Sequence, residues 1–229
     1  MIFHFRLRDI DAIAPWGSPA HPTLSWFGLS DGWYWLTLDG QELFRVCGDS
    51  AEAPAPTPPE PPYVDYPVVR LWEDVLDMLP TVLQPLPPDI AHALHDPDRF
   101  MRAIEIAEDK VLADGDADPE PLFAGLAFWH GRRLDTGHLV GAPRLWLWRD
   151  GDDMHALWRS RPPKPGADPL WHPVHGHTVL PVENFVGEVR AFDESFIAAM
   201  GQRVTTVLAA GGRRGVEIDL DQLLREQSD

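Results

Sequence analysis

The chain has 229 residues, 44% of them hydrophobic, so it is long enough to bury the core of a substantial domain. Lysine and arginine number 19 against 36 aspartate and glutamate residues, and the resulting net charge of −17 disfavours nucleic acid and anionic membranes as partners. The single cysteine, Cys47, excludes an internal disulfide and a zinc site made of several thiolates, and it fits a reducing compartment.

The first element predicted along the chain is a strand over residues 2–8. Apolar and polar side chains alternate there, which is the pattern of a strand with one buried face. The N-terminal segment has no long apolar run behind a basic start, so it is not predicted to be a secretion signal. No later segment reaches the ~20 apolar residues that a membrane-spanning helix needs. We therefore expect a cytoplasmic protein.

Residues 24–47 are predicted to form a three-stranded antiparallel meander. Its apolar runs are separated by Asp31-Gly32 and Asp39-Gly40, and such dipeptides favour tight hairpin turns because glycine accepts a positive φ. The segment that follows, residues 51–62, contains six prolines and no large apolar side chain. It is expected to be an extended surface loop.

Helices are predicted after this loop. From Tyr66 to Leu79 apolar residues recur at helical spacing, and the outer face is assigned to Arg70, Glu73, Asp74 and Asp77. A second helix is expected to begin at Asp96-Pro97, because proline suits the first helical position. Residues 119–130 are predicted to form a third helix.

Strand patterns return in the second half of the chain. Residues 144–149 and 154–159 are predicted to pair as a hairpin around the polar turn 150–153, and residues 174–180 can add one more strand. The longest helix is predicted from Val182 onward, with one apolar stripe formed by Phe185, Val189, Phe192, Phe196 and Met200. A short strand and helix are expected at 216–226.

The order of these elements predicts an α+β fold in a single domain of residues 1–229. Meander, helices, hairpin and long helix follow one another along the chain. This order favours an antiparallel sheet made from the N-terminal meander and the later hairpin, with amphipathic helices packed on one side. The sequence contains no internal repeat.

Four runs of residues carry a resemblance to a known family. They are Pro15-Trp16-Gly17, the WFGLSDGWYW segment at 26–35, the YVDY segment at 63–66 leading into RLWED at 70–74, and Ala142-Pro143-Arg144. These runs are similar to those of a family of uncharacterised bacterial proteins that are often actinobacterial. The resemblance covers most of the chain, and WFGLSDGWYW is its most specific part. It implies no known activity, so it assigns no catalytic residue.

Residues 28–32 match the G-x-S-x-G pattern of serine hydrolases. A nucleophile elbow requires a strand before the serine and a helix after it, whereas strands are predicted on both sides of Ser30. The turn chemistry explains the whole pattern. We therefore interpret Ser30 as a turn residue and predict no catalytic residue.

His172, His175 and His177 lie within six positions and are candidate metal ligands. His175 and His177 would share one face of a strand, and imidazoles ligate zinc, copper or nickel. No carboxylate lies nearby in the sequence to complete a catalytic site, so solvated loop histidines are the alternative interpretation. His92 and His95 form a second candidate pair. No cofactor is predicted.

Most tryptophans are expected to pack in the core, because they lie on predicted strands. Trp16 and Trp171 lie in irregular segments and are predicted to be surface aromatics. Acidic side chains cluster at a predicted helix end and at the hairpin tip, namely Glu108, Asp109, Asp114, Asp116, Asp118, Glu120, Asp150, Asp152 and Asp153. Such runs are typical of a solvated face, and residues 114–118 lack the glycine and glutamate of a calcium-binding EF-hand.

The sequence favours a non-enzymatic protein-binding function. The charge points to a basic protein as partner, with an immunity-type or inhibitor-type role as the most specific form of the prediction. The acidic clusters are expected to make the contacts, with Trp16 or Trp171 as anchor. Two alternatives stay open: a small metal-dependent enzyme that uses His172, His175 and His177, and a carbohydrate-binding module that uses exposed tryptophans.

Overall fold

The computed structural model describes residues 1–18, 20–47, 60–87, 128–160 and 168–209, together with the single residues 90, 94, 96, 99, 102, 106 and 166. The chain divides into two compact units. The first consists of Met1–Val75, Pro162–His172 and Val186–Asp229, and the second of Leu76–Arg161 and Pro173–Phe185. Several predicted elements lie wholly or mostly outside the described residues: the proline-rich loop, the helix from Asp96 and the elements at 216–226. Of the helix predicted at 119–130, residues 128–130 are described and are helical.

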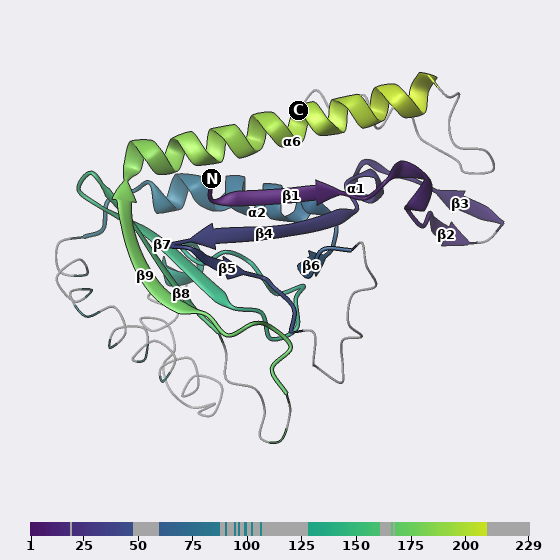
Figure 1. The fold of residues 1–229 in the computed structure, drawn as a ribbon. Coiled ribbons are helices and arrows are strands. Elements are labelled where there is room, and N and C mark those ends of the chain that lie inside the picture. The colour runs from purple at the N-terminus through teal and green to yellow at the C-terminus, as the bar shows by residue number, and fades with distance from the viewer. Residues whose placement is uncertain are drawn as a thin grey trace, which may run out of the picture. The chain divides into compact units, whose positions relative to one another are not determined.

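The first unit contains a four-stranded antiparallel sheet (Figure 1). The central strand β4 (Gly32–Leu38) pairs with β1 (Phe3–Leu7), β5 (Gln41–Leu43) and β6 (Val64–Asp65). Asp39 and Gly40, between β4 and β5, have φ values of 46° and 73°, as expected for an Asp-Gly hairpin turn. The predicted N-terminal strand and this hairpin are therefore confirmed.

The prediction that the meander begins with a strand at residues 24–29 is wrong. Trp26–Leu29 form a short helix, α1, and the Ser25 side chain caps it by accepting a 3.2 Å hydrogen bond from the Gly28 amide. A short apolar run fits a strand or a buried helical turn equally well, and here the cap favours the helix. Asp31-Gly32 is consequently not a hairpin turn, and Gly32 opens β4 without a positive φ.

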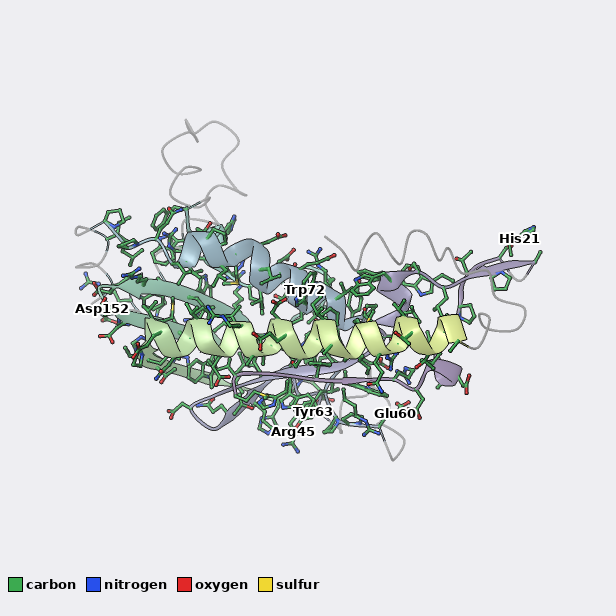
Figure 2. All side chains as sticks on the ribbon, turned by 90° about the horizontal axis from the view of Figure 1, so that it is seen from above. His21, Arg45, Glu60, Tyr63, Trp72 and Asp152 are labelled. Carbon is green, nitrogen blue, oxygen red and sulfur yellow. The ribbon has the colours of Figure 1, made fainter. Side chains whose placement is uncertain are left out.

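A short hairpin lies between β1 and α1, and the sequence did not predict it. The chain first makes a 3-10 turn, η1 (Ile10–Ala12), and then β2 (Trp16–Ser18) pairs with β3 (His21–Thr23). Figure 1 shows this hairpin as an arm beyond the end of β1, pointing away from the β1–β4 pair. His21 marks its tip (Figure 2).

The two long helices are confirmed. Helix α6 (Val182–Ala209) buries the predicted stripe, and Phe192 and Phe196 of that stripe contact Phe5 of β1 edge to face. Helix α2 (Val68–Val82) places Trp72 within 2.8 Å of an Asp193 carboxylate oxygen of α6, to which its indole nitrogen donates a hydrogen bond (Figure 2). No helix of the described residues has both the length and the apolar character needed to cross a membrane.

One residue of α2 departs from its predicted position. Asp74 was assigned to the outer face, but only 7% of it is exposed. Its carboxylate pairs at 3.0 Å with Arg70, one turn earlier in the helix, which allows the charge to be buried. The buried face of α2 is therefore wider than the spacing of its apolar residues alone predicts.

The second unit contains a three-stranded antiparallel sheet in the order β7-β8-β9. Strands β7 (Arg144–Asp150) and β8 (Asp153–Arg159) form the predicted hairpin, and β9 (His175–Pro181) is the predicted additional strand. One core cluster consists of Leu86, Leu94, Trp129, Trp146, Trp148 and Leu157. The α+β class is confirmed, although the strands fall into separate sheets and do not form one sheet from meander and hairpin.

Candidate functional site

Ser30 joins α1 to α2 in the first unit and is fully buried. Its hydroxyl donates to the Phe27 carbonyl at 2.8 Å and accepts the Val69 amide at 3.2 Å, while its carbonyl accepts the Val68 amide at 2.9 Å. Amides in the first turn of a helix have no partner within that helix, so Ser30 serves as a remote cap for α2. A helix precedes the serine and a strand follows it, which is the reverse of a nucleophile elbow.

Two arginines hold the same segment in place. Arg203 of α6 donates to the Leu29 carbonyl at 2.7 Å and also to the Arg8 carbonyl. The Arg8 side chain in turn bonds the Asp31 carboxylate at 2.9 Å and lies 4.3 Å from the Trp33 ring centre. Burial lowers the pKa of the Arg203 guanidinium. The WFGLSDGWYW segment therefore acts as a structural junction, in which the Leu29 carbonyl, the Ser30 hydroxyl and the Asp31 carboxylate have partners.

A hollow of about 980 Å³ lies beside this junction, between η1 and the last turns of α6. Its lining combines charges of both signs with apolar and polar side chains, and consists of Leu7, Asp9, Ile10, Asp11, Ala12, Ala199, Gln202, Arg203, Thr206 and Val207. Asp9 and Asp11 are exposed at its edge. Acidic groups therefore lie on the chain segment that leads to the β2–β3 arm.

Trp16 is an exposed aromatic on that arm. Its side chain is 54% exposed, which confirms the predicted surface position. The indole packs edge to face against Phe27, with ring centres 5.6 Å apart, and Phe27 packs in the same way against Tyr66 at 6.4 Å. The ring is thus supported from within the unit and accessible from outside. Among the described residues, Trp16 is the tryptophan that combines these two properties.

The surface prediction for Trp171 is wrong. Only 8% of this residue is exposed, and it packs edge to face against Phe44 at 6.4 Å. The irregular segment around it pairs with the chain after β5, because the Cys47 amide bonds the Leu170 carbonyl and the His172 amide bonds the Arg45 carbonyl. Backbone pairing over a long sequence separation therefore buries the indole.

The other tryptophans of the described residues are less exposed than Trp16. Trp35 lies between two nearly parallel rings, His4 at 5.1 Å and Tyr63 at 4.1 Å. The other tryptophans that were predicted to be core residues are buried, namely Trp26, Trp33, Trp146, Trp148 and Trp158. Stacking on a sugar requires an accessible face, so these positions give little support to a carbohydrate-binding surface.

The structure does not assemble the three predicted metal ligands into one site. His172 belongs to the first unit, whereas His175 and His177 lie on β9 of the second. In the part of the chain that the structure describes, no three or more histidine, cysteine or acidic side chains are grouped so as to hold a metal ion. His92 and His95 lie outside that part.

His177 lies instead beside His155, a residue that sequence reasoning missed. His155 Nδ1 and His177 Nε2 are 3.1 Å apart, and both rings are nearly parallel to the Trp148 indole at 5.1 and 5.7 Å. Burial lowers the pKa of His155, while the charges of Asp150 and Asp153 act in the opposite direction. Only the register of β8 with β9 brings the two histidines together, and no local pattern indicates that register.

The acidic clusters are described only in part. Asp150, Asp152 and Asp153 lie at the β7–β8 turn, with the Asp152 side chain fully exposed. Arg149 lies 3.7 Å from the Asp152 carboxylate, a separation at which an exposed ion pair contributes little. The hairpin tip thus retains its acidic character. The cluster from Glu108 to Glu120 lies outside the described residues.

Comparisons with known proteins place the chain in a family without assigning it an activity. No curated protein and no solved structure matches it. One family model matches residues 2–229, nearly the full sequence, and its description is a family of unknown function. This agrees with the resemblance to an uncharacterised family found in the sequence. The chain belongs to the family of unknown function DUF5984.

Proposed function

We propose that this chain is a non-enzymatic, cytoplasmic protein that binds a basic protein partner through the β2–β3 arm, in an immunity-type or inhibitor-type role. The observation that carries the proposal is Trp16, which is 54% exposed on that arm in a chain of net charge −17. Tryptophan is among the residues most enriched in binding hot spots.

The setting of Trp16 favours an anchor over a solvated side chain. Phe27 and Tyr66 support the indole in series, so its orientation is already restricted before a partner binds. Restricting an aromatic side chain in advance reduces the conformational entropy lost on association. Asp9 and Asp11, which are exposed on the segment that precedes the arm, add negative charge to the same unit.

The alternatives have weaker support. A metal-dependent enzyme normally needs three protein ligands, and the described residues contain no such group. A carbohydrate-binding module needs open aromatic faces, and among the described tryptophans only Trp16 is exposed. The acidic tip at Asp150–Asp153 remains available as a second contact region of the proposed function.

The test compares Trp16→Ala with Val140→Ala, a matched control that truncates another apolar side chain, which is 83% exposed. A partner captured from a lysate of the native host by the wild-type chain is purified and its binding kinetics are measured. Trp16→Ala is expected to cost about 2 kcal/mol, a roughly 30-fold rise in Kd carried mainly by faster dissociation. Val140→Ala is expected to bind as the wild type does. An acidic partner, or equal affinity for Trp16→Ala and wild type, contradicts the proposal.

A further inference from the structure

His155 and His177 meet edge to edge on the sheet of the second unit. Their ring centres are 5.3 Å apart, but His155 Nδ1 and His177 Nε2 are separated by only 3.1 Å. Because the nitrogens are closer than the ring centres, each nitrogen points toward the other ring. One N–H hydrogen lies between them, donated by one imidazole and accepted by the other.

The strand register sets this arrangement. Leu157 of β8 lies opposite His177 of β9, and His155 lies opposite Val179, so the two histidines are diagonal neighbours on one face. Strand β9 is at the edge of the sheet, where His177 is exposed and Val179 is 46% exposed. Trp148 of β7 lies nearly parallel to both imidazole rings and restricts the orientation of their planes. An ion in solution therefore has access to a pair of imidazoles that is already positioned.

The nitrogen separation suits two ligands of one metal ion. Zinc–imidazole bonds are about 2.0–2.1 Å long, which places two nitrogens of a tetrahedral site about 3.3–3.4 Å apart. The observed 3.1 Å differs from this by only a few tenths of an ångström, and rotation of the two rings within their planes directs both lone pairs at one ion. Asp150 and Asp153 act electrostatically on His155, and their negative charge also favours a cation there.

We propose that His155 and His177 form a two-histidine site for a divalent transition-metal cation, with water in the remaining coordination positions. When the metal binds, the hydrogen that lies between the two nitrogens moves to the second nitrogen of its own ring. Both imidazoles then stay neutral and coordinate through Nδ1 of His155 and Nε2 of His177. No further histidine, cysteine or acidic side chain of the described residues completes a group of three. The site is thus weaker than a structural zinc centre with four protein ligands.

The test titrates chelator-treated protein with Zn²⁺ alone and follows the heat of binding. Wild type is expected to take up one saturable equivalent, and His155→Gln and His177→Gln are each expected to lose it. His177→Gln lies on an exposed edge strand, so its circular dichroism is expected to match that of the wild type. Imidazole ¹⁵N NMR signals of His155 Nδ1 and His177 Nε2 are expected to shift with Zn²⁺ in the wild-type protein.

The control is a double substitution, His172→Gln with His175→Gln, which removes two exposed histidines from the same region of the sequence. This double variant is expected to bind one saturable equivalent of Zn²⁺, as the wild type does. The proposal is overturned if wild type shows no saturable uptake. It is also overturned if His155→Gln keeps the equivalent while the double variant loses it, because the metal then belongs to the 172–177 segment.

Discussion

Ser30 connects two helices through its hydroxyl and its carbonyl. Its surroundings show that the G-x-S-x-G pattern has a packing role in this chain, because the hydroxyl bonds the Phe27 carbonyl and the Val69 amide within a fully buried site. The sequence predicted a hairpin turn at Ser30, whereas the residue follows helix α1 and precedes β4. Its bond to Val69 could not be predicted, since the two residues are 39 positions apart.

Ser30→Ala is expected to lower the free energy of unfolding by about 1–3 kcal/mol, because it leaves the buried Val69 amide without its acceptor. Urea unfolding followed by circular dichroism measures the change. The control is Ser195→Ala, an exposed serine of α6 that bonds a carbonyl of its own helix, and little change is expected there. Equal effects of the two substitutions would contradict the capping role of Ser30.

His4 provides a pH-dependent prediction. Burial lowers the pKa of His4 below its ordinary 6.5, and its Nε2 is buried without a hydrogen-bond partner among the described residues. The unfolded chain thus binds a proton at a higher pH than the folded one does. The stability contributed by neutral His4 is present above pH 6.5 and declines as the pH falls below that value.

The measurement is the free energy of unfolding between pH 8 and pH 5, for wild type, His4→Gln and His4→Phe. Both substitutions remove the titrating group, and phenylalanine keeps a ring stacked on Trp35. Wild type is expected to lose more stability on acidification than either variant. Parallel pH profiles for all three proteins would show that His4 makes no such contribution.

At the scale of elements, Gly32 decides how closely β1 and β4 approach. A Cβ atom added there would lie 2.8 Å from the Leu7 Cα and closer still to the Arg6 carbonyl oxygen. The sequence suggested that a turn requires this glycine, but its φ is not positive. The requirement is steric, and it arises only when the two strands are paired.

Gly32→Val is therefore expected to destabilise the first unit by about 1–3 kcal/mol through overpacking against the backbone of β1. The matched control is Gly187→Ala in α6, where an added Cβ meets no atom within 4 Å. That change is expected to stabilise the protein by about 0.5–1 kcal/mol, because alanine has less backbone freedom to lose in a helix. Thermal unfolding of both variants distinguishes the two effects, and a neutral Gly32→Val would refute the steric argument.

At the scale of the whole molecule, the net charge of −17 governs encounters with other molecules. Such a charge accelerates association with a cationic surface, and added salt weakens it as the Debye length shrinks from ~10 Å at 0.1 M to ~3 Å at 1 M. For the partner proposed to bind Trp16, the association rate is expected to fall with salt while the dissociation rate changes less. Stopped-flow measurements at several salt concentrations test this, and an association rate that is independent of salt counts against a basic partner.

The sequence by itself determined the α+β class, both long helices, the β7–β8 hairpin and the exposure of Trp16. These features follow from periodicity and turn chemistry within short segments, where neighbouring residues select the backbone conformation. The predicted strand at residues 24–29 failed because a short apolar run satisfies two conformations, and the Ser25 cap, with its 3.2 Å bond to the Gly28 amide, belongs to the helical one.

Only the tertiary structure decided the burial of Trp171, the Ser30 bond to α2 and the pairing of His155 with His177. Each depends on contacts between residues far apart in the sequence: Leu170 with Cys47, Ser30 with Val69, and β8 with β9. Strand register is set by which side chains can be buried on the assembled sheet, and a shift by one residue would move His177 to the opposite face. The physical reason is that these contacts form only when the whole core packs, so no local pattern carries them.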